Sequence, residues 1–194
     1  TGKNSLELVW NGKPEKLVYS ASKLEIQEKI PYRSIKKTQA LDTCNWSNLL
    51  IKGNNLKVIP ALLKKPFKPI IQNNGGLKLA YIDPPFFTGQ NKLINKSIPK
   101  NDLYASNGEI AYQDKWNNSI ETYLSILYKQ LFLIKTMLED GGFIYVHVDY
   151  RTSSAIKLIL DEIFGSENLI GYIIWVLNNG AKGRRSWSNQ HNDI

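Results

Sequence analysis

The chain has 194 residues, of which 42% are hydrophobic and 22% are charged. This size and hydrophobic share suit one folded domain and exclude a wholly disordered chain. The single cysteine, Cys44, excludes an internal disulfide, and we expect a cytoplasmic protein. The longest apolar run, 169–177, is shorter than the roughly 20 residues that a membrane span needs, so we expect no membrane partner.

The positive charge is concentrated in the first third of the chain. Residues 1–70 hold 13 Lys and Arg against 5 Asp and Glu, whereas residues 71–194 hold 12 against 12. A basic flank of this kind favours contact with a polyanion, and nucleic acid is the obvious one. A solvated lysine-rich surface that keeps the protein soluble explains the same charge equally well.

Residues 1–46 are polar, basic and interrupted by Pro14 and Pro31, which indicates an N-terminal extension with one helix over 21–29. From residue 47 the pattern is that of a folded domain. In chain order we predict a strand over 49–52, a helix over 56–64, a loop over 65–76 and a buried strand over 77–82.

The second half alternates helices and strands. Residues 87–118 are polar and without a clear period, and a connection of that length is typically functional or disordered. We then predict a helix over 119–138 that Gly141 and Gly142 stop, a strand over 143–148, a helix over 153–164, a strand over 170–177, a basic loop over 178–189 and the start of another strand at 191–194. In the first half, the 49–52 strand, the 56–64 helix and the 77–82 strand are expected to form the strand–helix–strand unit of a parallel sheet.

The tetrapeptide that follows the 77–82 strand carries the clearest chemistry: Asp83, Pro84, Pro85 and Phe86. Ligands of open α/β sheets bind at the carboxyl ends of the strands. Because proline has no N–H, the Asp83 carboxylate and the Pro84 carbonyl can both accept hydrogen bonds from one amino group, while Phe86 can stack on a flat heterocycle. A proline-rich turn capped by Asp83 explains these four residues equally well.

This tetrapeptide and several other segments resemble the adenine-specific DNA methyltransferases of the beta type, and most closely the modification subunits of type III restriction-modification systems. The resemblance covers most of the chain in the family's order, and it follows only the amino-terminal, catalytic portion of such proteins. The matching segments are 7–13, 48–56, 81–90, 112–114, 142–149, 161–168 and 191–194.

The resemblance implies a three-layer, Rossmann-like fold of the S-adenosylmethionine-dependent methyltransferases. It also implies a site-specific DNA adenine N6-methyltransferase of a restriction-modification system, which transfers a methyl group from S-adenosylmethionine to a flipped adenine. Double-stranded DNA is then a partner, the intact protein is expected to be an oligomer, and a restriction subunit stays an open question. The alternative is a non-catalytic subunit that binds DNA or another protein and keeps the methyltransferase-like fold.

By the same resemblance, Asp83, Pro84, Pro85 and Phe86 are the catalytic residues. The acid and the first proline carbonyl bind the target amine, and the aromatic ring stacks on the flipped base. The resemblance assigns cofactor binding to Asn54 and Asp83. Asn54 replaces an acid of the family, so a plain turn residue explains it equally well.

Two further features depart from the family or depend on loops. Phe87 replaces a residue that is more often small or polar, so it either narrows the pocket or packs. The basic loop offers DNA-binding candidates, for which a solvated face is an equal alternative: Lys182, Arg184, Arg185 and Trp187. His147 and Asp149 alternate on one strand without another His or Cys at ligand spacing, so we predict no metal site and a structural histidine.

The glycine-rich Phe-x-Gly-x-Gly turn that binds S-adenosylmethionine in relatives is absent from these 194 residues. We therefore expect 47–194 to be a partial catalytic domain that lacks the cofactor-binding half, with a fold incomplete at its C-terminal side. Such a domain should show a gap or an exposed edge between the 49–52 and 77–82 strands.

Overall fold

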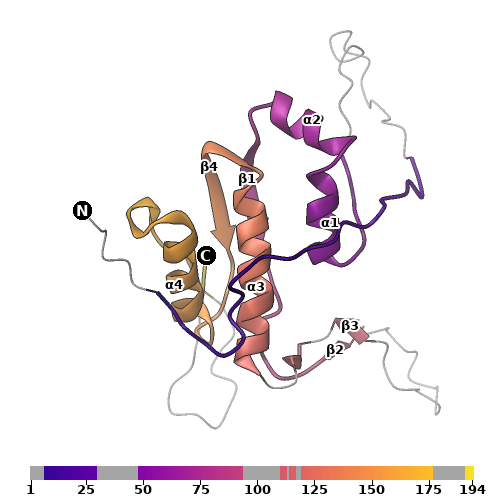
Figure 1. Cartoon of the computed structure of the whole chain (residues 1–194). Helices are drawn as coiled ribbons and strands as arrows, with labels where there is room; N and C mark the ends of the chain where they lie inside the picture. The colour runs from indigo at the N-terminus through magenta and orange to yellow at the C-terminus, as the bar shows by residue number, and fades with distance from the viewer. Residues whose placement is uncertain (1–6, 30–47, 94–109, 113, 117–118, 177–190) are drawn as a thin grey trace, which may run out of the picture.

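A computed structural model describes residues 7–29, 48–93, 110–112, 114–116, 119–176 and 191–194. The chain is a mixed α/β protein (Figure 1). Its elements are α1 (Asn55–Leu62), α2 (Phe67–Asn73), β1 (Leu77–Ile82), β2 (Lys92–Leu93), β3 (Ile110–Tyr112), α3 (Ile120–Lys135), β4 (Leu138–Val146), α4 (Ser153–Phe164), the 3-10 helix η2 (Ser166–Asn168), β5 (Ile174–Val176) and β6 (His191–Asp193).

The centre of the fold is the parallel pair of β1 and β4, with α3 as the connecting helix. Leu79 pairs with Phe143, and the register continues to the pair of Ile82 and Val146. β1, α3 and β4 thus form a parallel strand–helix–strand unit, whereas the unit predicted over 49–52, 56–64 and 77–82 was wrong because no strand forms over 49–52. Two antiparallel pairs, β2 with β3 and β5 with β6, flank it, and β6 joins the end of β4 through a bridge between Val148 and Asp193.

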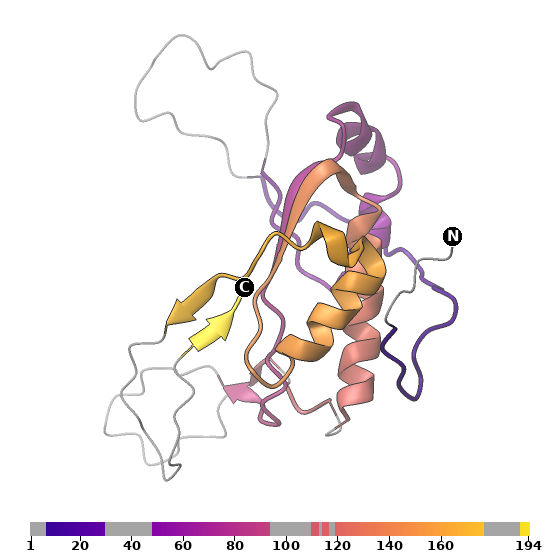
Figure 2. The ribbon, with the colours of Figure 1, turned by 90° about the vertical axis from the view of Figure 1, so that its left-hand side faces the viewer.

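Helices α3 and α4 lie on one side of the β1–β4 pair (Figure 2). Because side chains alternate along a strand, β1 and β4 send one set of residues, including Ile82 and Val146, into the core beneath these helices. The other set is exposed by 36–56% and forms what we call the open face of the sheet: Leu79, Tyr81, Phe143 and Tyr145.

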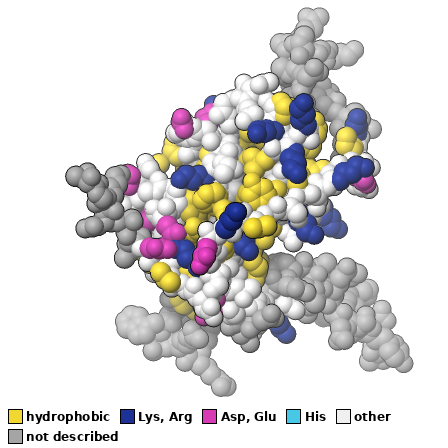
Figure 3. Space-filling view, in the orientation of Figure 1, with side chains coloured by type: hydrophobic (Ala, Val, Ile, Leu, Met, Phe, Trp, Pro, Cys, Tyr) yellow, Lys and Arg dark blue, Asp and Glu magenta, His cyan; other side chains and the backbone are white. Residues whose placement is uncertain are grey.

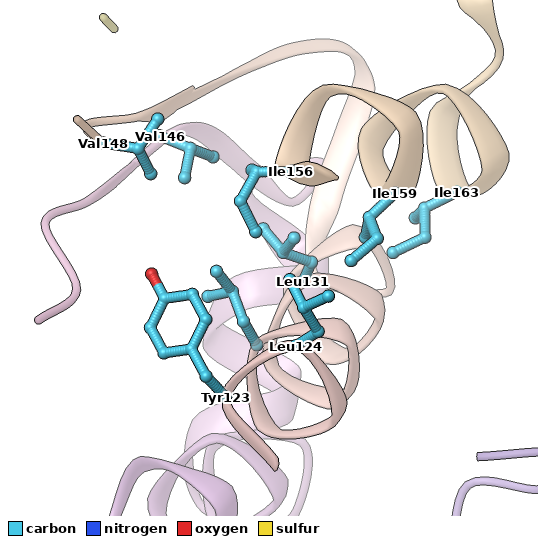
Figure 4. Close-up of a cluster of buried hydrophobic side chains, with 9 residues drawn as sticks. Tyr123, Leu124, Leu131, Val146, Val148, Ile156, Ile159 and Ile163 are labelled. Atoms are coloured by element: carbon cyan, nitrogen blue, oxygen red, sulfur yellow. The ribbon is translucent and has the colours of Figure 1, made fainter. Parts of the chain in front are cut away.

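The core is built mainly by α3 and α4 (Figure 4). Helix α3 begins at its N-cap Ser119, whose hydroxyl accepts from the N–H of Thr122, and Glu121 lies in its first turn. Apolar residues at helical spacing then face the sheet and α4. The buried cluster consists of Tyr123, Leu124, Leu127, Leu131, Val146, Val148, Ile156, Ile159 and Ile163.

The described part of the N-terminal extension, 7–29, is irregular, and several of its residues contact the rest of the fold. The indole N–H of Trp10 donates to the Ser125 hydroxyl at 2.8 Å. The Lys13 ammonium lies 2.6 Å from Glu7 and 2.8 Å from Glu162 of α4. Burial lowers the pKa of Lys13, but the hydrogen bonds to Glu162 and Glu7 outweigh it and raise the pKa above its ordinary value.

Three predictions for the first half were wrong. No helix forms over 21–29, which is largely exposed, and a short helix without a packing partner is marginal in water. No strand forms over 49–52, where Leu50 is fully exposed. The predicted loop contains α2, because Pro66 and Pro69 fall at the cap and first turn, where a helix tolerates proline.

Strand β1 and helix α4 have the predicted bounds, and other boundaries differ. Helix α3 ends at Lys135, and Gly141 and Gly142 lie inside β4 rather than stopping a helix. A Cβ at Gly142 would lie 2.8 Å from the Leu77 carbonyl oxygen, so a glycine is needed at this irregular register. Strand β5 is shorter than predicted, because 170–173 is irregular and exposed.

Candidate active site

Asp83 and His147 lie next to each other because they follow two paired parallel strands. The His147 N–H donates to the Ile82 carbonyl at 2.8 Å, so the strand pairing continues to the first residue beyond each strand. By alternation, both side chains belong to the same side as the open face of the sheet. The Asp83 side chain is 59% exposed, so it is accessible to a ligand.

The ring of His147 lies beside two residues of the tetrapeptide, Asp83 and Phe86. Its Nδ1 lies 3.6 Å from an Asp83 carboxylate oxygen, and its centroid lies 5.2 Å from that of Phe86. Pro84 and Pro85 are half-buried between them. The carboxylate, the proline carbonyl and the aromatic ring are thus on one short segment at the carboxyl end of β1.

A buried carboxylate, Asp114, fixes the segment directly after the tetrapeptide. It accepts from the N–H groups of Phe87 at 3.0 Å and Thr88 at 2.8 Å, from the Thr88 hydroxyl at 2.5 Å and from the Trp116 indole at 2.9 Å. Burial raises the pKa of Asp114, but the hydrogen bonds from Thr88, Trp116 and Phe87 outweigh it and the net pKa is lowered. The sequence reasoning counted 112–114 in the resemblance but missed this role.

Phe87 packs rather than entering the site. Its φ is +54°, an uncommon conformation for a bulky residue, and its ring lies 5.7 Å from that of Tyr123 in the core. The hydrogen bond from its N–H to Asp114 helps to hold this backbone conformation. Of the two interpretations of Phe87, the packing one is therefore supported.

The other predicted site residues have different surroundings. The side chain of Asn54 is exposed and caps α1, since its oxygen accepts from the Leu56 N–H at 3.0 Å. The DNA-binding candidates Lys182, Arg184, Arg185 and Trp187 lie outside the described residues. Within the described part of the chain, no three His, Cys, Asp or Glu residues gather as a metal site would require, and no helix is long and apolar enough to cross a membrane.

The family model described as DNA methylase matches residues 77–194, more than half of the chain. The chain belongs to this DNA methylase family. The matched part begins with β1 and includes the Asp83 tetrapeptide, Asp114 and His147. Both strands that end at the candidate site, β1 and β4, lie within the matched residues.

Curated relatives of this chain include two modification subunits and a type II methyltransferase. The type III restriction-modification enzyme EcoP15I Mod subunit of Escherichia coli is 28% identical over 142 residues, which cover 68% of this chain and 21% of that protein. The probable HindVI Mod subunit of Haemophilus influenzae is 34% identical over 126 residues, which cover 65% and 13%. The type II methyltransferase M.KpnI of Klebsiella pneumoniae is 29% identical over 161 residues, which cover 81% and 33%. The chain therefore spans a third or less of the length of each of these three relatives.

Proposed function

We propose that the intact protein is a site-specific DNA adenine N6-methyltransferase of a restriction-modification system, with S-adenosylmethionine as methyl donor. The observation that carries this proposal is the exposed Asp83 carboxylate at the carboxyl end of β1, with Pro84 and Phe86 beside it. The likeness to modification subunits supports the restriction-modification setting. A restriction subunit, an oligomeric assembly and a cytoplasmic location belong to the same proposal.

The chemistry follows from what these three residues offer. The amino nitrogen of adenine is a weak nucleophile because its lone pair is delocalised into the ring. The Asp83 carboxylate and the Pro84 carbonyl accept hydrogen bonds from the two N–H groups of this amine. These hydrogen bonds favour a tetrahedral nitrogen that can attack. When bound, S-adenosylmethionine supplies an electrophilic methyl group on a sulfonium. The N–C bond forms as the S–C bond breaks with its electron pair staying on the sulfur, and the proton that the nitrogen loses passes to the solvent. Phe86 offsets the stacking that the base loses on leaving the duplex.

The residues present fit the cofactor in part. An exposed carboxylate at Asp83 suits the positive charge of a sulfonium donor. Asn54 uses its oxygen to cap α1, and its amide nitrogen remains able to donate to a ligand. We keep Asn54 and Asp83 as the proposed cofactor contacts, and we propose that the glycine-rich part of that site is not supplied by these 194 residues.

We further propose a three-layer fold for the intact domain. Helices α3 and α4 cover one face of the β1–β4 pair, while the other face exposes large apolar side chains. Among the described residues β1 pairs only with β4, which leaves its other edge open. An open edge and an uncovered apolar face are what a sheet has when its second helical layer is missing. The division into an extension over 1–46 and a partial catalytic domain over 47–194 is part of this proposal.

DNA contact is proposed for the basic loop with Lys182, Arg184, Arg185 and Trp187 and for the basic N-terminal third. On the face drawn in Figure 3, Lys and Arg side chains are spread around α1 and α2. Positive side chains in number provide the sequence-independent part of DNA affinity.

The test is methyl transfer by the full-length protein from labelled S-adenosylmethionine to unmethylated DNA, followed by chromatography of the nucleosides. We expect N6-methyladenine. Asp83→Ala should abolish transfer and leave duplex binding nearly intact, because most affinity comes from phosphate contacts. The exposed carboxylate of Asp140 provides the matched control, Asp140→Ala, which should methylate normally. DNA binding without any methyl transfer by the unsubstituted protein would favour the non-catalytic alternative.

A further inference from the structure

The side chain of His147 contacts two segments that are far from it in the sequence, the end of β1 and strand β6. Its Nδ1 lies 3.1 Å from the Tyr81 hydroxyl and 3.6 Å from Asp83, both at the end of β1. Its Nε2 lies 3.0 Å from the side-chain nitrogen of Asn192 in β6. The bridge between Val148 and Asp193 holds β6 against the end of β4 and so places Asn192 beside the ring.

The Asn192 contact favours one tautomer of the neutral imidazole. With the Asn192 amide nitrogen facing the ring, the His147 Nε2 accepts, because that nitrogen carries only hydrogens. In a neutral ring the proton is then on Nδ1, which faces the Tyr81 hydroxyl and the Asp83 carboxylate, and both can accept it. The Asn192 side chain thereby orients the Nδ1–H of His147 toward the Asp83 carboxylate.

The Asp83 carboxylate has few other contacts. Its side chain is 59% exposed, whereas that of His147 is 16% exposed. Among the side chains of the described residues, only that of His147 makes a polar contact with the Asp83 carboxylate. The same ring also packs against Phe86, with centroids 5.2 Å apart and planes tilted by 57°. One rigid ring therefore restrains both groups that must meet the flipped base.

We propose that His147 is a positioning residue for methyl transfer: its Nδ1–H, fixed by Asn192, aims the Asp83 carboxylate while its ring supports Phe86. This inference rests on the proposed function. His147 acts through Asp83 and Phe86 and does not itself touch the substrate. The distance of 3.6 Å shortens to a hydrogen bond when the bound base orders the acid.

The kinetic test compares His147→Leu with His147→Asn in the full-length protein. The Asn amide nitrogen takes about the place of Nδ1 and keeps an N–H toward Asp83, whereas Leu keeps only bulk. We expect His147→Leu to lower kcat about 10- to 100-fold with the KM for DNA little changed, since a misplaced group loses rate rather than binding. His147→Asn should recover a large part of this loss. The control is His191→Gln, since that side chain is 49% exposed and has no contact with the tetrapeptide in the described residues.

A second variant keeps the test informative if His147→Leu does not fold. Asn192→Ala removes the amide donor without touching Asp83 or Phe86, and it should lower kcat in the same direction by less. Histidine ¹⁵N resonances of the full-length protein, assigned by the signal that His147→Leu removes, should show the Nδ1–H form in the unsubstituted protein and a mixture in Asn192→Ala.

The outcomes separate this inference from the function itself. Absence of methyl transfer in the unsubstituted protein overturns the proposed function, whereas the ¹⁵N measurement still tests the tautomer. The inference is overturned if folded His147→Leu keeps kcat within about threefold of the unsubstituted protein, if His147→Asn is no better than His147→Leu, or if the Nε2–H form predominates.

Discussion

The carboxylate of Asp114 accepts two hydrogen bonds from Thr88 across 26 residues of sequence, one from the backbone N–H at 2.8 Å and one from the hydroxyl at 2.5 Å. Thr88 lies two residues after Phe86, the last residue of the Asp83 tetrapeptide. Because Asp114 is fully buried, these bonds are shielded from water and fix the exit of the loop. Stability and the shape of the site therefore depend on the same carboxylate.

Replacing this carboxylate by an amide should destabilise the protein. In Asp114→Asn the amide NH₂ faces donors that it cannot accept from, so at least one buried N–H or hydroxyl is left without a partner. We expect a loss of about 1–3 kcal/mol in the free energy of unfolding, measured by urea denaturation. The exposed control Asp140→Asn should change it by less than about 0.5 kcal/mol. Equal effects of the two substitutions would contradict the role of Asp114.

Acid should remove the same stabilisation. The pKa of Asp114 is lowered from its ordinary value of 3.8, so its contribution is complete above that value and is lost as the pH falls through the lower, folded-state pKa. The difference in unfolding free energy between the unsubstituted protein and Asp114→Asn should therefore be constant above pH 3.8 and shrink below it. A difference that stays constant into strong acid would show that the carboxylate charge is not what stabilises the loop.

Two tyrosines should respond in opposite directions to loss of the hydroxyl. Burial raises the pKa of Tyr123 to about 12, the nearby Thr152 hydroxyl opposes this, and neither of these two buried hydroxyls makes a well-formed hydrogen bond among the described residues. Tyr123→Phe should therefore be neutral or stabilising. Tyr128 instead donates to Glu162 at 3.1 Å, so Tyr128→Phe should lose about 1 kcal/mol. Thermal melting of both variants checks this, and a clear loss in Tyr123→Phe would reveal a partner for its hydroxyl.

The elements that the sequence predicted to the residue are those whose signals are local. Strand β1 is an apolar run closed by Asp83, and α4 has helical apolar spacing closed by Gly165 at φ +94°. The failures depend on partners: a strand over 49–52 needs a neighbour to pair with, and its residues find none among the described ones.

The same reason explains what was missed in the candidate site. The tetrapeptide is contiguous, so its chemistry could be read directly from the sequence. Asp114 acts on Thr88, and His147 acts on Asp83, only because the fold brings distant residues together. His147 was expected to be a structural histidine. No local sequence pattern distinguishes a structural histidine from one that positions a neighbouring carboxylate.

The last prediction concerns the basic loop and DNA. Neutralising three phosphates with Lys182, Arg184 and Arg185 releases counterions, so the logarithm of affinity should fall with the logarithm of salt by about 0.9 for each contact. The triple alanine variant of the full-length protein should bind duplex DNA more weakly, with a shallower slope. The matched control removes three basic residues outside the N-terminal third that already pair with carboxylates: Lys78, Arg151 and Lys157. This control has the same change in net charge and should keep the slope. If both variants lower the slope equally, the loop contributes only to the general field of the protein and does not contact phosphates.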